Sequence, residues 1–216
     1  MNEGKTPMAQ DLKALSFATA DDSEELARAE LYGLLARLWF SPPDEALLRQ
    51  FKVAVTEAPT PGAFLEAPWQ ALVAAMRATT PQAAADEYDA LFQGVGKPEV
   101  FLYGSYYLAG FLNEKPLVQL RDDLARLGLA RDETRGETED HVAGVFEVMR
   151  YLIAGDDVAV CNLEQQRRFF RAHVQPWVEK MGDAVIAHPR ADLYAKLATL
   201  TQAFVQVETQ GFDLLE

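Results

Sequence analysis

Apolar residues along this chain recur at the three- and four-residue spacing of amphipathic helices. Two clear stripes are Leu31, Leu34, Leu35 and Leu38, and Leu117, Leu120, Leu124 and Leu127. Runs of alternating β-branched residues between turn signals, which would indicate strands, do not compete with this pattern. The sequence therefore predicts an all-α protein of about ten helices packed ridge into groove around one core.

Proline, glycine and short polar residues mark the expected helix ends. Helices are expected to begin at the capping box Asp22-x-x-Glu25, at Pro81 and at Pro116, and to end at Gly128 and Gly155. The segment from Ala130 to Thr138 is charged and lacks apolar periodicity, which indicates an exposed hinge. We expect a flexible tail over 1–20 and one helical domain over 21–216, with a two-lobed variant split at 130–138.

Composition indicates the cellular compartment and the kind of partner that this protein suits. No run of about 18 apolar residues predicts a membrane span, and the N-terminus lacks the basic and apolar regions of an export signal. A single cysteine, Cys161, excludes an internal disulfide framework and suits a reducing cytoplasm. The net charge of −13 disfavours nucleic acid and anionic lipid and favours a basic partner, although such a surface also serves solubility alone.

Motifs for chemistry are weak. Gly94-Val95-Gly96-Lys97 resembles the end of a phosphate loop, but Pro98 stands where a hydroxyl residue would hold magnesium. Glu137 and His141 are spaced i, i+4, whereas di-iron helical bundles use Glu and His at i, i+3. We expect no metal, no cofactor and no catalytic centre.

Polar insertions into apolar helix faces indicate binding instead. One set is Glu87, Leu91 and Phe92 with the aromatic turn Tyr103, Ser105, Tyr106 and Tyr107. Aromatic rings with polar handles at a flexible turn are typical of an adaptable peptide site. Core packing of Leu91 and a capping role for Ser105 are the structural alternatives.

A second insertion, Glu139-Asp140-His141, opens a helix. Its acids can simply complement the helix dipole. His141 continues an apolar stripe, so it is predicted to point inward or into a groove and to be mostly neutral near pH 7. A third group, Gln166, Phe170, His173 and Trp177, spans a helix break at Pro176 and is interpreted as structural.

Taken in order, these segments resemble the TorD/DmsD family, which is grouped with the nitrate-reductase delta-subunit (NarJ-like) chaperones. The resemblance covers roughly Leu26 to the C-terminus and departs from the family at Gly104, where relatives often carry an acid. It implies an all-helical cytoplasmic chaperone that binds the twin-arginine signal peptide and apo form of a molybdenum-cofactor oxidoreductase before export. Exchange of helical halves in the family makes either a monomer or a domain-swapped homodimer an expectation.

The residues suit such a client, because a twin-arginine signal has a cationic head and an apolar stretch. The predicted peptide contacts are Glu87, Leu91, Phe92, Tyr103, Ser105, Tyr106, Tyr107, Asp140 and His141. The tract from Tyr103 to Leu117 resembles relatives associated with formate dehydrogenases. Two alternatives stay open: a small helical enzyme that uses His141 with Asp140, and a structural subunit of an oxidoreductase complex.

Overall fold

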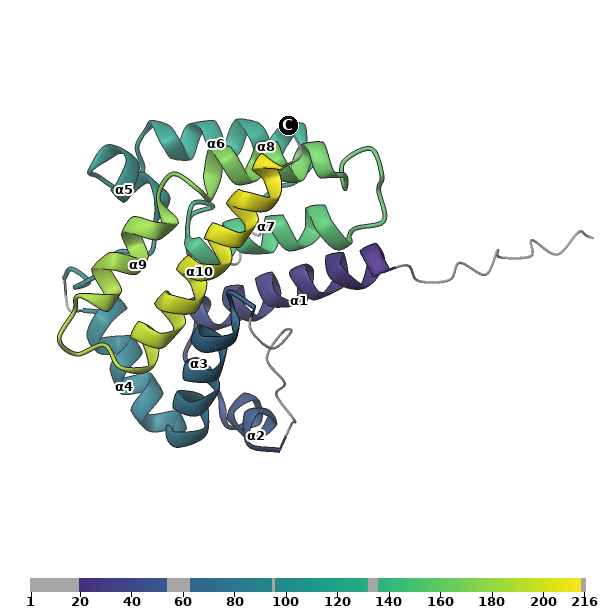
Figure 1. The fold of residues 1–216 in the computed structure, drawn as a ribbon. Helices are drawn as coiled ribbons and strands as arrows, with labels where there is room; N and C mark the ends of the chain where they lie inside the picture. The colour runs from purple at the N-terminus through teal and green to yellow at the C-terminus, as the bar shows by residue number, and fades with distance from the viewer. Residues whose placement is uncertain (1–19, 54–62, 95, 132–135, 215–216) are drawn as a thin grey trace, which may run out of the picture.

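A computed structural model describes residues 20–53, 63–94, 96–131 and 136–214. Ten helices lie in these ranges (Figure 1): α1 Ala20–Phe40, α2 Glu45–Val53, α3 Glu66–Ala78, α4 Pro81–Phe92, α5 Gly104–Ala109, α6 Lys115–Arg126, α7 Val142–Ala154, α8 Leu163–His173, α9 Val178–Ile186 and α10 Leu193–Asp213. The described chain contains no strand, which confirms the all-α prediction. None of the described helices has the length and hydropathy needed to cross a bilayer.

Several helix ends follow the predicted signals. Thr80 caps α4 by accepting the Ala83 N–H, and Pro81 occupies the first turn, where its missing N–H costs nothing. Gly128, just after α6, adopts a left-handed φ of 71° that ends the helix. The capping box expected at Asp22 is wrong, because α1 already begins at Ala20 and Asp22 lies in its first turn.

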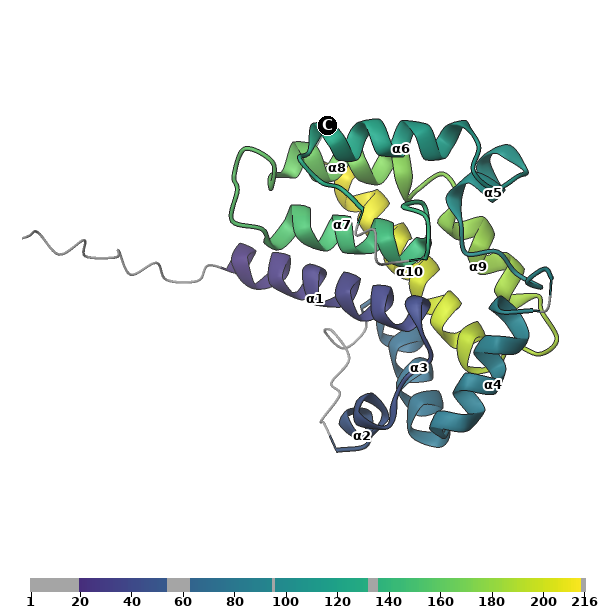
Figure 2. The same cartoon turned by 180° about the vertical axis from the view of Figure 1, so that it is seen from behind.

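One hydrophobic core runs through the whole described chain. Helix α1 packs along α7, and the long α10 packs against α9 and α3 (Figures 1 and 2). The largest fully buried side chains come from both halves of the sequence: Trp39, Trp177, Tyr32, Tyr194, Phe146 and Phe170. The single domain is thus confirmed, and α1 and α7, on either side of the proposed hinge, share this core. Residues 132–135 of that hinge and the tail 1–19 lie outside the described residues.

A partly buried polar network joins three helices inside this core. Arg28 of α1 donates two hydrogen bonds of 2.8 Å to Glu208 of α10, and the Tyr32 hydroxyl donates to the same carboxylate at 3.0 Å. Gln166 of α8 accepts a third bond from Arg28. Because removing one partner of a buried pair leaves an uncompensated charge, this network fixes the relative positions of α1, α8 and α10.

Candidate functional site: a groove along helix α7

The start of α7 is tied to the start of α5 by backbone pairing. Tyr103 and His141 form an isolated antiparallel bridge. Gly104 N–H donates to the Asp140 carbonyl at 2.9 Å, and Val142 N–H donates to the Leu102 carbonyl at 2.8 Å. The aromatic turn and the Glu139-Asp140-His141 segment, separate in sequence, therefore lie side by side.

Asp140 holds this junction with its side chain. The buried carboxylate accepts the Ser105 N–H at 2.8 Å and the Thr138 hydroxyl at 2.6 Å. Asp140 therefore caps α5 from outside the helix, a role that the alternative interpretation had given to Ser105. The Ser105 hydroxyl is itself fully buried and has no hydrogen-bond partner among the described residues.

His141 is the N-cap residue of α7. Its Nδ1 accepts the Ala143 N–H at 3.2 Å. Burial lowers the pKa of His141 to about 4, so the imidazole is neutral at pH 7, as the sequence predicted. The carboxylate of Asp140 is turned to α5 instead, so the two side chains do not form the acid–base pair of the enzyme alternative.

Two further acids flank this junction. The Tyr103 hydroxyl donates to the Glu137 carboxylate, and burial with this acid nearby raises the pKa of Tyr103. Glu139 receives a two-pronged ion pair from Arg121 at 3.0 and 2.9 Å. Burial acts to raise the pKa of Glu139, but the guanidinium outweighs it and the pKa is lowered. Both acids are therefore held in place by hydrogen bonds, and the lowered pKa keeps Glu139 charged at neutral pH.

A groove of about 870 Å³ opens between α1, α7 and the segment after α6. It follows α7 from its first residues to its last, and a helix of thirteen residues is about 20 Å long. Gly144 leaves the backbone carbonyl of Glu139 room to approach, since a Cβ there would lie 2.9 Å from that oxygen. The groove is lined by Ala36, Arg37, Phe40, Leu124, Leu129, Ala130, Arg131, Glu137, Thr138, Glu139, His141, Ala143, Gly144, Glu147, Val148, Arg150, Tyr151, Ala154 and Gly155.

Charges in the groove are unevenly compensated. Glu147 pairs with Arg150 at 2.9 Å, and Arg37 pairs with Asp44 at 3.0 Å. Glu137 is bonded to the neutral Tyr103 hydroxyl and, within the described residues, has no ion-pair partner. Among the described residues, the groove thus presents a carboxylate that has no ion-pair partner, with apolar side chains and Arg131 also in its lining.

Of the nine predicted contact residues, His141 alone lines this groove. Glu87 lies elsewhere, where its carboxylate accepts the N–H groups of Asp192, Leu193 and Tyr194 and caps α10. Leu91 is fully buried and Phe92 is 8% exposed, so both belong to the core. The carboxylates of Glu87 and Asp140 are thus bonded at different places, the start of α10 and the start of α5. Peptide contact by these residues stays an untested prediction.

The aromatic turn is packed mostly against its own surroundings. Tyr106 stacks on Phe101 with ring centroids 4.1 Å apart. The Tyr107 hydroxyl donates to the Phe101 carbonyl at 2.8 Å, and its ring stacks on Trp177. Tyr103 contacts the His141 ring edge-on at 5.1 Å. Of these rings, Tyr103 contacts the groove residue His141.

The third polar group is structural, as interpreted from the sequence. The Trp177 indole donates to the His173 carbonyl at 2.7 Å across the break between α8 and α9. The Gln166 amide donates to the Leu152 carbonyl of α7. Glu137 is not among the predicted contacts, because in the sequence its spacing from His141 indicates only a metal site or an acid–base pair. In the described chain, no group of three His, Cys, Asp or Glu side chains is placed to hold a metal ion.

Comparisons with known proteins agree with this architecture. The sequence profile described as "Nitrate reductase delta subunit" matches residues 62–182. A chaperone protein TorD from Vibrio cholerae is 28% identical over 139 residues, which is 61% of this chain and 63% of that protein. The TorD chaperone of Aliivibrio fischeri is 25% identical over 135 residues, covering 59% of this chain and 62% of its own length. The match therefore spans less than two thirds of these relatives.

The fold also has a solved counterpart. A structure assigned as a redox enzyme maturation protein from Archaeoglobus fulgidus superposes with a TM-score of 0.57 at 18% identity, over 90% of this chain and 99% of that one. This likeness concerns the fold. The family profile covers more than half of the sequence and confirms the resemblance seen in its motifs: the chain belongs to the nitrate reductase delta subunit family, together with the TorD chaperones.

Proposed function

We propose that this protein is a cytoplasmic chaperone for the precursor of a molybdenum-cofactor oxidoreductase and that the α7 groove binds the twin-arginine signal peptide of that client. Family membership supports the chaperone class, since the curated relatives are TorD chaperones. The resemblance of the tract from Tyr103 to Leu117 suggests a formate dehydrogenase as the client. In this proposal the protein binds an apo-enzyme and performs no catalysis.

The peptide assignment is carried by the Glu137 carboxylate, which lines the groove and has no ion-pair partner in the part of the chain that the structure describes. A guanidinium pairs with a carboxylate through two parallel hydrogen bonds, which gives both attraction and orientation. Glu137 already accepts one bond from Tyr103, and a carboxylate has room for further donors. The cationic head of a signal peptide therefore has a partner at this end of the groove.

The remaining groove fits the apolar part of such a peptide. Val148, Tyr151 and Ala154 continue along α7 away from Glu137. A groove of about 20 Å accommodates about six residues of extended chain at roughly 3.3 Å each. The net charge of −13 steers a cationic segment toward the protein.

A co-purification experiment tests the function. The precursor of the client, with and without its signal peptide, is captured on the immobilised chaperone before and after cofactor loading. We expect capture of the signal-bearing apo form and release on loading. Stoichiometric retention of the mature, loaded enzyme would contradict a chaperone and favour a structural subunit.

A further inference from the structure

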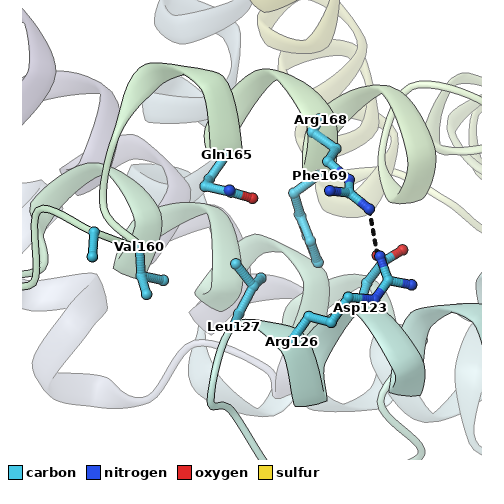
Figure 3. A pocket seen from close by; sticks show the side chains of 8 residues that line it. Asp123, Arg126, Leu127, Val160, Gln165, Arg168 and Phe169 are labelled. Atoms are coloured by element: carbon cyan, nitrogen blue, oxygen red, sulfur yellow. Dashed lines mark ion pairs between the residues drawn. The ribbon is translucent and has the colours of Figure 1, made fainter.

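A second pocket lies between α6 and α8 and shares no lining residue with the α7 groove (Figure 3). Its volume is about 100 Å³. Its apolar lining includes Leu127, Val160 and Phe169, and two arginines lie at one end, Arg126 of α6 and Arg168 of α8 (Figure 3). The pocket thus combines a small apolar space with two guanidinium groups.

The two arginines share a single carboxylate. Arg126 lies 2.6 Å from Asp123, and Arg168 lies 3.6 Å from the same oxygen of Asp123. That second distance is too long for a hydrogen bond. Both arginine side chains are more than half exposed, at 56% and 58%. Each guanidinium therefore keeps N–H donors for which the described residues offer no acceptor.

His173 holds the Asp123 carboxylate in place, and this carboxylate in turn orients the two arginines. Its other oxygen lies 2.7 Å from Nε2 of His173, and a carboxylate can only accept, so the imidazole donates. Burial lowers the pKa of His173, which keeps the imidazole neutral near pH 7. With a neutral His173, two positive guanidinium groups face one negative carboxylate. The pocket end therefore carries excess positive charge on a protein whose net charge is −13.

These features identify the chemistry of a ligand. Two adjacent guanidinium groups with unused donors match a carboxylate. An apolar cavity of about 150 Å³ holds a benzene ring, so this smaller space fits a branched aliphatic group. Because the pocket is small, the carboxylate and the aliphatic group must lie close together on the ligand. The C-terminal residue of a peptide ending in leucine or valine carries both on one Cα.

We propose that the α6–α8 pocket binds the carboxyl terminus of a partner peptide that ends in a branched aliphatic residue. The carboxylate bridges Arg126 and Arg168, and the side chain occupies the space over Phe169. This site is independent of the α7 groove and of its cationic peptide, because the two sites use different residues and bind ligands of opposite charge. Capture of a peptide terminus by oriented N–H donors is a known recognition mode.

Chemical-shift titration of the full chain with short peptides tests the proposal. The probes are an acetylated Gly-Ser-Gly-Leu acid, its C-terminal amide, the same acid ending in glycine, free isovalerate and inorganic phosphate. We expect saturable shifts for residues of the pocket with the leucine acid, and affinity at least about tenfold weaker for the amide and for the glycine acid.

Two matched variants complete the test. Arg168→Gln should weaken binding of the leucine acid at least about tenfold. Arg167→Gln, which removes a charge from the neighbouring residue that pairs with Glu164, should leave it unchanged. Equal binding of acid and amide, or unchanged binding to Arg168→Gln, would overturn the proposal. Isovalerate binding as tightly as the peptide would assign the pocket to a free small acid instead, and phosphate binding as tightly would reduce it to an unselective anion site.

Discussion

The carboxylate of Asp140 accepts the backbone N–H of Ser105 at 2.8 Å across a sequence separation of thirty-five residues. Together with the backbone pairing of Tyr103 and His141, this bond joins the first turn of α5 to the segment that precedes α7. It places Tyr103 where its hydroxyl reaches Glu137. The bond between Asp140 and Ser105 thus helps to position Glu137, whereas the sequence had suggested Asp140 as a peptide contact.

Loss of the Asp140 carboxylate should destabilise the fold. Asp140→Ala leaves the buried Ser105 N–H without its acceptor, and we expect a loss of roughly 1–3 kcal/mol in the free energy of unfolding. Asp140→Asn keeps an acceptor and should lose less. Urea denaturation of the two variants beside the wild type measures the difference. Equal stability of Asp140→Ala and the wild type would contradict the capping role.

Glu87 is expected to matter for stability rather than for binding. Its carboxylate accepts three N–H groups at the start of α10, so Glu87→Ala should lose about 1–2 kcal/mol of stability. The matched control is Asp86→Ala, which removes an exposed acid on the same helix. Affinity for a twin-arginine peptide should be alike in both variants. A selective loss of affinity in Glu87→Ala would restore Glu87 as a peptide contact.

His141 should make stability depend on pH in mildly acidic solution. Its pKa is about 4 in the folded protein and about 6.5 when unfolded, so between these values the unfolded chain binds the extra proton. Stability is therefore expected to fall as pH decreases from 6.5 to 4, by as much as roughly 3 kcal/mol from this group.

The variant His141→Asn isolates that contribution. Asparagine is a good N-cap residue and does not titrate, so the variant should keep α7 capped and lose this part of the pH dependence. Thermal unfolding between pH 4 and 7 gives the wild-type minus variant difference. A difference that does not change with pH would contradict the buried neutral imidazole.

The absence of a side chain at Gly104 allows close packing against Trp177, a contact that the sequence did not reveal. A Cβ at this position would lie 3.0 Å from the Trp177 ring, so a side chain here requires the indole to shift by a few tenths of an ångström. Gly104→Glu should destabilise by about 1–3 kcal/mol and change the near-ultraviolet circular dichroism. Gly136→Glu is the control, because a Cβ there meets nothing within 4 Å. Equal effects of the two variants would contradict a tight contact with Trp177.

The sequence predicted the architecture well because helical periodicity and helix-end signals are local. Leu117, Leu120 and Leu124 form the buried face of α6 as predicted, and Gly128 follows the end of that helix. His141 was also predicted correctly as an inward, neutral side chain, since a helix start and an apolar stripe together determine its environment.

The site was harder to predict because its groove is built by tertiary packing. Phe40 and Glu137 line the same groove although about a hundred residues separate them, and no local pattern relates them. Glu87 was predicted to bind peptide because the sequence does not distinguish an exposed carboxylate from one that caps a distant helix. The hydrogen bonds and ion pairs of each carboxylate distinguish Glu137, which lines the groove, from Glu87, which caps α10.

The proposed peptide site depends most directly on Glu137. Calorimetry of a twin-arginine peptide, and of the same peptide with both arginines changed to glutamine, is measured on wild type, Glu137→Gln and the surface control Asp86→Asn. Glutamine keeps an acceptor for the Tyr103 hydroxyl and removes the charge. We predict about tenfold weaker binding of the arginine peptide to Glu137→Gln, little change for Asp86→Asn, and no effect of Glu137→Gln on the glutamine peptide. Wild-type affinity of Glu137→Gln for the arginine peptide would contradict the assignment of the α7 groove.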